Sequence, residues 1–268
     1  MSDEKSLKYN EPWILQRADP YVYRHTDGSY YFTASVPAYD GIVLRRAGTL
    51  AELSGAEEVM VWKKHESGPM SYHIWAPEIH YLFGKWYIYF AGGEAEDIWK
   101  IRPYVLECSG DDPLTDEWVE LGKMKRAAED EFSFEAFSLD ATVFENKGEY
   151  YYVWAEKVGV GKMISNLYIA KMESGNQLKT VQILLTTPDY DWERKGFWVN
   201  EGPAVIHHDG KLFLTYSASE TGVDYCVGML SIDEDADILD PRLWKKERYP
   251  VLKTCEKLGI YGPGHNSF

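Results

Sequence analysis

Aromatic and aliphatic residues occur in pairs of short runs, and a tight turn separates the two runs of each pair. The first pair covers residues 18–25 and 30–35 around Asp27-Gly28, and similar pairs lie at residues 75–91, 139–154 and 199–217. Apolar runs of this length around such turns predict β-hairpins. Each interval between hairpins has room for two further strands, such as the apolar run at residues 42–45.

The hairpins recur with a period of about 60 residues. The marker residues that open them, spaced 59, 62, 61 and 64 residues apart, are Asp19, Glu78, Asp140, Glu201 and His265. Four strands per repeat are typical of a propeller blade. We therefore predict an all-β five-bladed β-propeller with four-stranded blades, a single domain over residues 1–268 with blades starting near residues 19, 78, 140, 201 and 265. The fifth blade is incomplete, since the chain stops at Phe268.

Composition narrows the classes of protein and partner. Of 268 residues, 45 % are apolar and 15 % aromatic, which is ample for a core. The formal net charge is −15, with no concentrated basic patch. Such a surface repels phosphate backbones and anionic lipids, so we expect neither nucleic acid nor a membrane as partner.

Cysteine usage and the N-terminus suggest a location. Three widely spaced cysteines, Cys108, Cys226 and Cys255, predict neither a disulfide framework nor a zinc site. The polar N-terminus leads into no apolar segment of the signal-peptide kind. We therefore expect a cytoplasmic protein.

The marker residues are the candidate functional groups. In a propeller the innermost strands surround a central channel, so equivalent positions converge although they lie far apart in sequence. Asp19, Glu78, Asp140, Glu201 and His265 are then expected around one cavity. Carboxylates brought together raise one another's pKa, which allows one acid to stay protonated beside an ionised base. Such a site suggests glycosidic chemistry or a metal.

Two further residue types add detail to this cavity. His265 lies in Gly262-Pro263-Gly264-His265 and is predicted to act at the axis as a metal ligand or a hydrogen-bond donor. One histidine with carboxylates suits calcium better than zinc, so calcium is the predicted cofactor, with no organic cofactor. Trp75 is a candidate for stacking on a sugar, with packing between blades as the alternative.

The order and spacing of these motifs resemble glycoside hydrolase family 43 over nearly the whole chain. The resemblance rests on the following motifs: Ala18-Asp19-Pro20-Tyr21, Trp75-Ala76-Pro77-Glu78, Leu139-Asp140-Ala141, Asn200-Glu201-Gly202-Pro203 and Gly262-Pro263-Gly264-His265. It implies a five-bladed propeller that acts on arabinofuranosides, xylosides or arabinan. It also implies Asp19 as general base, Asp140 as the acid that tunes pKa and orients substrate, and Glu201 as general acid. His265 matches an axial histidine found near calcium or water.

The sequence hypothesis is an inverting exo-glycosidase that releases terminal α-L-arabinofuranosyl residues from arabinan- or arabinoxylan-derived oligosaccharides during hemicellulose degradation. Substrate-binding candidates are Trp75, Glu78, Asn200 and His265. A β-xylosidase or endo-arabinanase of the same family is the alternative enzyme. A sugar-binding propeller without activity is the alternative from another class.

The incomplete fifth blade predicts a partner. A propeller closes its ring so that no apolar blade face or strand edge stays open. We therefore expect a second polypeptide, most simply the remainder of the same gene product, to complete this blade and supply an arginine that the family uses to contact substrate. Homo-oligomerisation is the alternative way to cover the open faces.

Overall fold

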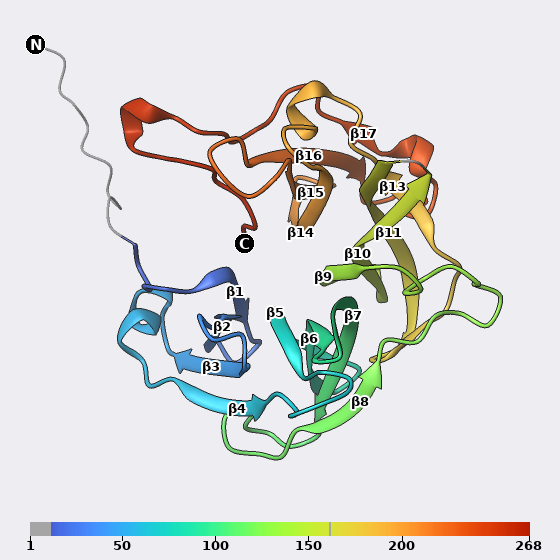
Figure 1. The fold of residues 1–268 in the computed structure, drawn as a ribbon. Coiled ribbons are helices and arrows are strands. Elements are labelled where there is room, and N and C mark those ends of the chain that lie inside the picture. Colours follow the sequence, from blue (N-terminus) through green and yellow to red (C-terminus); the bar gives the residue numbers. More distant parts are fainter. Residues whose placement is uncertain (1–11, 161) are drawn as a thin grey trace, which may run out of the picture.

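The computed structural model describes residues 12–160 and 162–268 as consecutive sheets arranged around a central axis. Strands β1, β5, β9 and β14 lie nearest this axis, and later strands of each unit lie further out (Figure 1). The structure thus confirms the predicted β-propeller architecture. The predicted hairpins are the pairs β1–β2, β5–β6, β9–β10 and β14–β15.

The strand bounds follow the repeat. The first two blades contain β1 (Ala18–Arg24), β2 (Tyr30–Ser35), β3 (Gly41–Ala47), β4 (Val59–Lys63), β5 (Tyr72–Leu82), β6 (Lys85–Glu94), β7 (Asp97–Cys108) and β8 (Val119–Lys123). The next two contain β9 (Ser138–Asn146), β10 (Glu149–Val160), β11 (Lys162–Ser174), β12 (Gln177–Leu178), β13 (Ile183–Thr186), β14 (Trp198–His208), β15 (Lys211–Ala218), β16 (Cys226–Asp233) and β17 (Lys245–Lys246). Short 3₁₀ helices are η1 (Leu50–Gly55), η2 (Asp191–Glu193), η3 (Pro241–Leu243) and η4 (Glu256–Leu258).

Blade three departs from the simple four-strand pattern. Blades one and two are separate sheets with the orders β1-β2-β3-β4 and β5-β6-β7-β8. In blade three, two short strands, β12 and β13, share the outer edge of β11. β11 also pairs in parallel with the start of β14 through Ile164–Trp198 and Ser165–Val199, so blades three and four form one nine-stranded sheet. This junction borders the central cavity.

The hydrophobic core lies between neighbouring blades. Trp86 and Tyr31 pack between blades one and two, Trp154 and Tyr89 between blades two and three, and Tyr216 between blades three and four. The aromatic runs of the hairpins therefore supply the inter-blade core, where large rings bury much surface per residue. This packing makes the inner strands a rigid base for the side chains at the axis.

The end of the chain lies at the position of a fifth blade. Residues 262–268 contain no strand and run beside the axis between β14 and β1 (Figure 1). His265 N–H donates to Ser217 Oγ in β15 at 2.6 Å, and the His265 ring pairs with Asp19 in β1. The segment therefore bridges blades four and one. In the described part of the chain, no helix is long and apolar enough to cross a membrane.

Candidate active site

A left-handed residue marks the inner strand of each blade and the fifth position. Those residues, with φ between 46° and 53°, are Asp19, Ala76, Asp140, Gly202 and His265. In β1, β5, β9 and β14 the strand register shifts at the same place. Such bulges redirect side chains, and strained conformations of this kind cluster at functional sites. The repeated unit at the axis is therefore a bulge, which a carboxylate occupies in only some blades.

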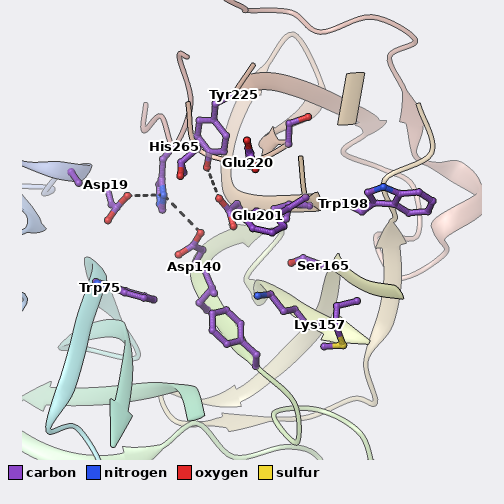
Figure 2. A pocket seen from close by; sticks show the side chains of 18 of the residues that line it. Asp19, Trp75, Asp140, Lys157, Ser165, Trp198, Glu201, Glu220, Tyr225 and His265 are labelled. Atoms are coloured by element: carbon purple, nitrogen blue, oxygen red, sulfur yellow. Dashed lines mark hydrogen bonds and ion pairs between the residues drawn. The ribbon is translucent and has the colours of Figure 1, made fainter. Parts of the chain in front are cut away.

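The bulges surround one cavity of about 560 Å³. Asp19, Asp140, Glu201, His265 and Trp75 all line it. Figure 2 shows Asp19 and Trp75 on one side and Glu201 on the other, with Asp140 and His265 between them. Residues from four inner strands and the terminal segment thus meet at one place.

Asp19 is held as an anion. Its Oδ1 lies 3.0 Å from His265 Nδ1, and its Oδ2 accepts a hydrogen bond from Ser35 Oγ at 2.5 Å. Burial raises the pKa of Asp19, but the His265 charge and hydrogen bonds from His265, Ser35 and the Ala76 backbone more than offset burial, so its pKa is lowered. An ionised carboxylate in the cavity can accept a proton.

The pKa values of Asp140 and Glu201 are shifted in the opposite direction from that of Asp19. Burial raises the pKa of Asp140 well above its usual value, and the charges of Glu201 and Asp19 add to this, against His265 and the Gly202 N–H. That N–H lies 3.2 Å from Asp140 Oδ2. Burial also raises the pKa of Glu201, although the hydrogen bond from Tyr225 opposes it. Carboxyl groups whose pKa values are pushed apart in one site are typical of an acid and base pair.

His265 is a cation in this arrangement. Burial lowers its pKa, but the charges of Asp140, Asp19 and Glu201 outweigh burial and raise the pKa to about 10. Its Nδ1 lies 3.0 Å from Asp19 Oδ1 and 3.8 Å from Asp140 Oδ2 (Figure 2). The imidazolium therefore links the two carboxylates.

These contacts do not fit a metal ion held directly by side chains. A histidine must be neutral to ligate a metal, and the His265 nitrogen that faces the acids is engaged in ion pairs. Within residues 12–160 and 162–268, no group of three or more His, Cys, Asp or Glu is placed to hold a metal. The calcium prediction stays untested and enters no step below.

Aromatic rings form the wall of the cavity next to Asp19. Trp75 lies 5.9 Å from Tyr39 and 6.4 Å from Trp99, measured between ring centroids. Trp99 is 60 % exposed, and all three rings line the cavity. This wall offers apolar faces on which a sugar ring can stack.

Two candidate substrate-binding residues lie outside the cavity, and we correct both assignments. Glu78 is two residues beyond the bulge at Ala76, is buried, and pairs through Oε2 with His80 Nε2 at 2.9 Å. Asn200 is fully buried, and its Nδ2 donates to Glu193 Oε1 at 3.0 Å. Both side chains are therefore bound to neighbouring side chains beneath the site and do not line the cavity.

Sequence reasoning also missed residues that line the cavity. Tyr225 donates a hydrogen bond to Glu201 Oε1 at 2.7 Å, and Lys157 Nζ lies 3.8 Å from the centroid of the Phe137 ring. Tyr225 opens the apolar run of residues 225–230, which predicts one of the further strands of the repeat and gives no sign of a side chain at the axis. Lys157 had a weak signal, since it is a charged residue within β10, two positions after the apolar and aromatic run of residues 150–155.

The chain has close relatives among known proteins. The sequence profile described as glycosyl hydrolases family 43 matches residues 9–268. An extracellular exo-α-(1→5)-L-arabinofuranosidase of Streptomyces avermitilis is 49 % identical over 98 % of this chain and 53 % of its own length. The enzyme of the same name from Streptomyces chartreusis is 48 % identical over 97 % of this chain and 77 % of its own. The chain therefore spans about half the length of the first relative.

A solved structure of an α-L-arabinofuranosidase is also similar to this chain. The α-L-arabinofuranosidase of Lactobacillus brevis superposes with a TM-score of 0.89 at 50 % identity, over 98 % of this chain and 82 % of the other. The two Streptomyces relatives are both named extracellular, so the expectation of a cytoplasmic location is wrong. That expectation rested on the polar N-terminus, which carries no such information where relatives are longer. By profile, sequence identity and fold, the chain belongs to glycosyl hydrolase family 43.

Proposed function

We propose that the protein is an inverting exo-glycosidase that releases terminal α-L-arabinofuranosyl residues from arabinan- or arabinoxylan-derived oligosaccharides. The observation that supports this proposal is that two carboxyl groups in one cavity have pKa values shifted in opposite directions. The pKa of Asp19 is lowered and that of Glu201 is raised. The names of the Streptomyces relatives support the sugar and the exo action.

The two groups divide the proton transfers of hydrolysis. Asp19 accepts a proton from a water molecule while the oxygen of that water forms a bond to the anomeric carbon. Glu201 donates its proton to the glycosidic oxygen as the bond from that oxygen to the anomeric carbon breaks. The electron pair of the broken bond stays on the glycosidic oxygen, which takes the proton from Glu201, and the sugar leaves with inverted configuration.

Asp140 and His265 support this division. His265 carries a positive charge beside Asp19 and so favours the ionised form of the base. Asp140 lies between the base and the acid (Figure 2) and accepts from the Gly202 N–H, next to Glu201 in the chain. Asp140 therefore fixes the backbone that carries the acid, and the charge of Asp19, together with burial, favours a protonated Glu201.

Hydrolysis of a panel of 4-nitrophenyl glycosides and linear arabino-oligosaccharides by the full-length protein tests the proposal. We expect α-L-arabinofuranosides to be cleaved and arabinose to be released one unit at a time. Preferred cleavage of β-xylosides, or release of longer fragments from arabinan, would assign the alternative enzymes. Binding of arabino-oligosaccharides without any hydrolysis would assign the sugar-binding propeller.

We also propose that a further segment of the same gene product covers the open face of blade one. An apolar groove of about 690 Å³ lies there, lined by Trp13, Val22, Phe32, Leu50 and Phe268, among others. Trp13 is 42 % exposed, and Leu50 and Phe268 are about half exposed. A face of this kind is stabilised when another sheet packs on it.

Oxidative footprinting of the full-length protein tests whether a further segment packs on this groove. Trp13 should be protected from oxidation, while Trp99, which is exposed in the cavity wall, should react and serves as the control. Protection of Trp13 that disappears on dilution would assign the cover to a second copy of the chain. Equal reactivity of Trp13 and Trp99 would contradict any cover.

A further inference from the structure

Tyr225 makes a direct contact with the proposed acid. It precedes β16 and is 6 % exposed, and its hydroxyl donates to Glu201 Oε1 at 2.7 Å (Figure 2). The terminal segment holds its ring in place, because a Cβ added to Gly264 would lie 2.2 Å from Tyr225 Cε1. Glycine at this position lets the backbone pack against the ring, and the next residue along, His265, reaches Asp19.

We propose that Tyr225 is a positioning residue for Glu201, fixing Oε2 as the oxygen that carries the transferable proton. This inference rests on the proposed function of Glu201 as the general acid. A protonated carboxyl group has one O–H donor and one carbonyl acceptor. Since Oε1 accepts from Tyr225, the proton belongs on Oε2, the oxygen that remains available to the substrate.

The hydrogen bond from Tyr225 also favours the proton transfer from Glu201 to the glycosidic oxygen. As Glu201 gives up its proton, Oε1 becomes part of an anion, and hydrogen bonds to charged acceptors are stronger than those to neutral ones. The bond from Tyr225 therefore strengthens as the reaction proceeds. Interactions that strengthen in the transition state raise kcat, whereas interactions of constant strength do not.

Other charged groups act on Glu201 through space. The cations and acids that do so are Lys157, His265, Asp19 and Asp140. None of these, within the described residues, is placed at hydrogen-bond distance from Glu201. Removing the Tyr225 hydroxyl leaves this set of charges unchanged, and besides the bond to Glu201 it removes an interaction with the uncharged side chain of Ser217.

Tyr225→Phe in the full-length protein tests the inference. We expect kcat on an unactivated α-1,5-linked arabinobioside to fall about tenfold, with a smaller loss on a 4-nitrophenyl substrate that needs less protonation. The basic limb of the pH profile should move to higher pH, because the anion of Glu201 loses a donor. Tyr89→Phe is the matched control, since Tyr89 is fully buried and donates at 2.8 Å to the Gly175 carbonyl, away from the cavity.

Infrared spectroscopy gives a readout that does not depend on turnover. The C=O stretch of protonated Glu201, assigned by its loss in Glu201→Gln, should move to higher wavenumber in Tyr225→Phe and stay in place in Tyr89→Phe. An unmoved band, or a basic limb and substrate dependence that match Tyr89→Phe, would overturn the inference. Parent protein that cleaves no arabinofuranoside would overturn the proposed function instead, while the infrared band would still report the contact.

Discussion

Ser35 connects the proposed base to the neighbouring blade, and its removal is a measurable perturbation. Ser35, at the end of β2, is buried. Its Oγ donates to Asp19 Oδ2 at 2.5 Å and accepts from the Ala76 N–H at 2.8 Å. Ser35→Ala therefore removes a donor from a carboxylate and an acceptor from a buried backbone amide.

The expected loss of stability follows from these two contacts. A hydrogen bond to a charged group contributes about 1.5–3 kcal/mol. The Ala76 N–H also interacts with Asp19, so it keeps one acceptor after the change. We therefore expect about 2–3 kcal/mol of destabilisation at neutral pH, which corresponds to a fall in Tm of about 4–12 °C for a protein of this size.

The effect should depend on pH with a defined sign. The pKa of Asp19 is lowered in the folded protein, so its contribution is present above 3.8, its value in an unfolded chain, and is lost as pH falls through the folded value. The destabilisation by Ser35→Ala should fade in the same range. The acidic limb of the activity profile should move to higher pH, because the base loses a donor that favours its anion.

Calorimetry of the parent and two variants from pH 3 to pH 8 measures this. Thr33→Val is the matched control, because Thr33 lies on the same strand, is fully buried, and its hydroxyl finds no hydrogen-bond partner among the described residues. The control should stay within about 1 kcal/mol of the parent. Equal Tm changes in the two variants, or a Ser35→Ala acidic limb that does not move, would refute the reasoning.

The remaining predictions concern Glu201 and Asp19. Burial raises the pKa of Glu201 in the folded protein above its ordinary value of 4.5. The folded state therefore loses stability as pH rises from about 4.5 through the pKa of Glu201 in the folded protein. Glu201→Gln should have a higher Tm than the parent at pH 7, and the difference should vanish below about pH 4.5. A lower Tm for this variant at pH 7 would show that the charged form is favoured by the fold. In kinetics, Glu201→Gln should lose about 10² to 10⁴ in rate on unactivated substrates and less on 4-nitrophenyl substrates, whereas Asp19→Asn should lose activity on both alike. Equal losses for Glu201→Gln on both substrates would contradict its role as acid.

The repeat and the positions of the hairpins could be predicted from sequence. Residues such as Trp86, Tyr89 and Trp154 alternate with the turns at a regular period, and they form the cores between blades. The side-chain directions at the axis could not be predicted in the same way. A bulge changes which side of the strand a residue faces, so a shift of one or two residues moves a side chain out of the cavity.

Particular residues show where this limit lies. Asp19 and Asp140 are bulge residues and line the cavity, whereas Glu78 lies two residues past the bulge and pairs with His80. Glu201 precedes its bulge residue, Gly202, and still reaches the cavity. The Tyr225 contact joins residues 24 apart without a shared pattern, so only the folded arrangement reveals it.

The stereochemistry of the first-formed product tests the central claim most directly. Proton NMR during hydrolysis of an α-L-arabinofuranoside by the full-length protein follows the anomeric signal before mutarotation. If Asp19 activates water on the face opposite the bond that Glu201 protonates, the β-configured sugar forms first. First formation of the α-configured sugar would contradict the account, because it would require a carboxylate to act as nucleophile in place of water.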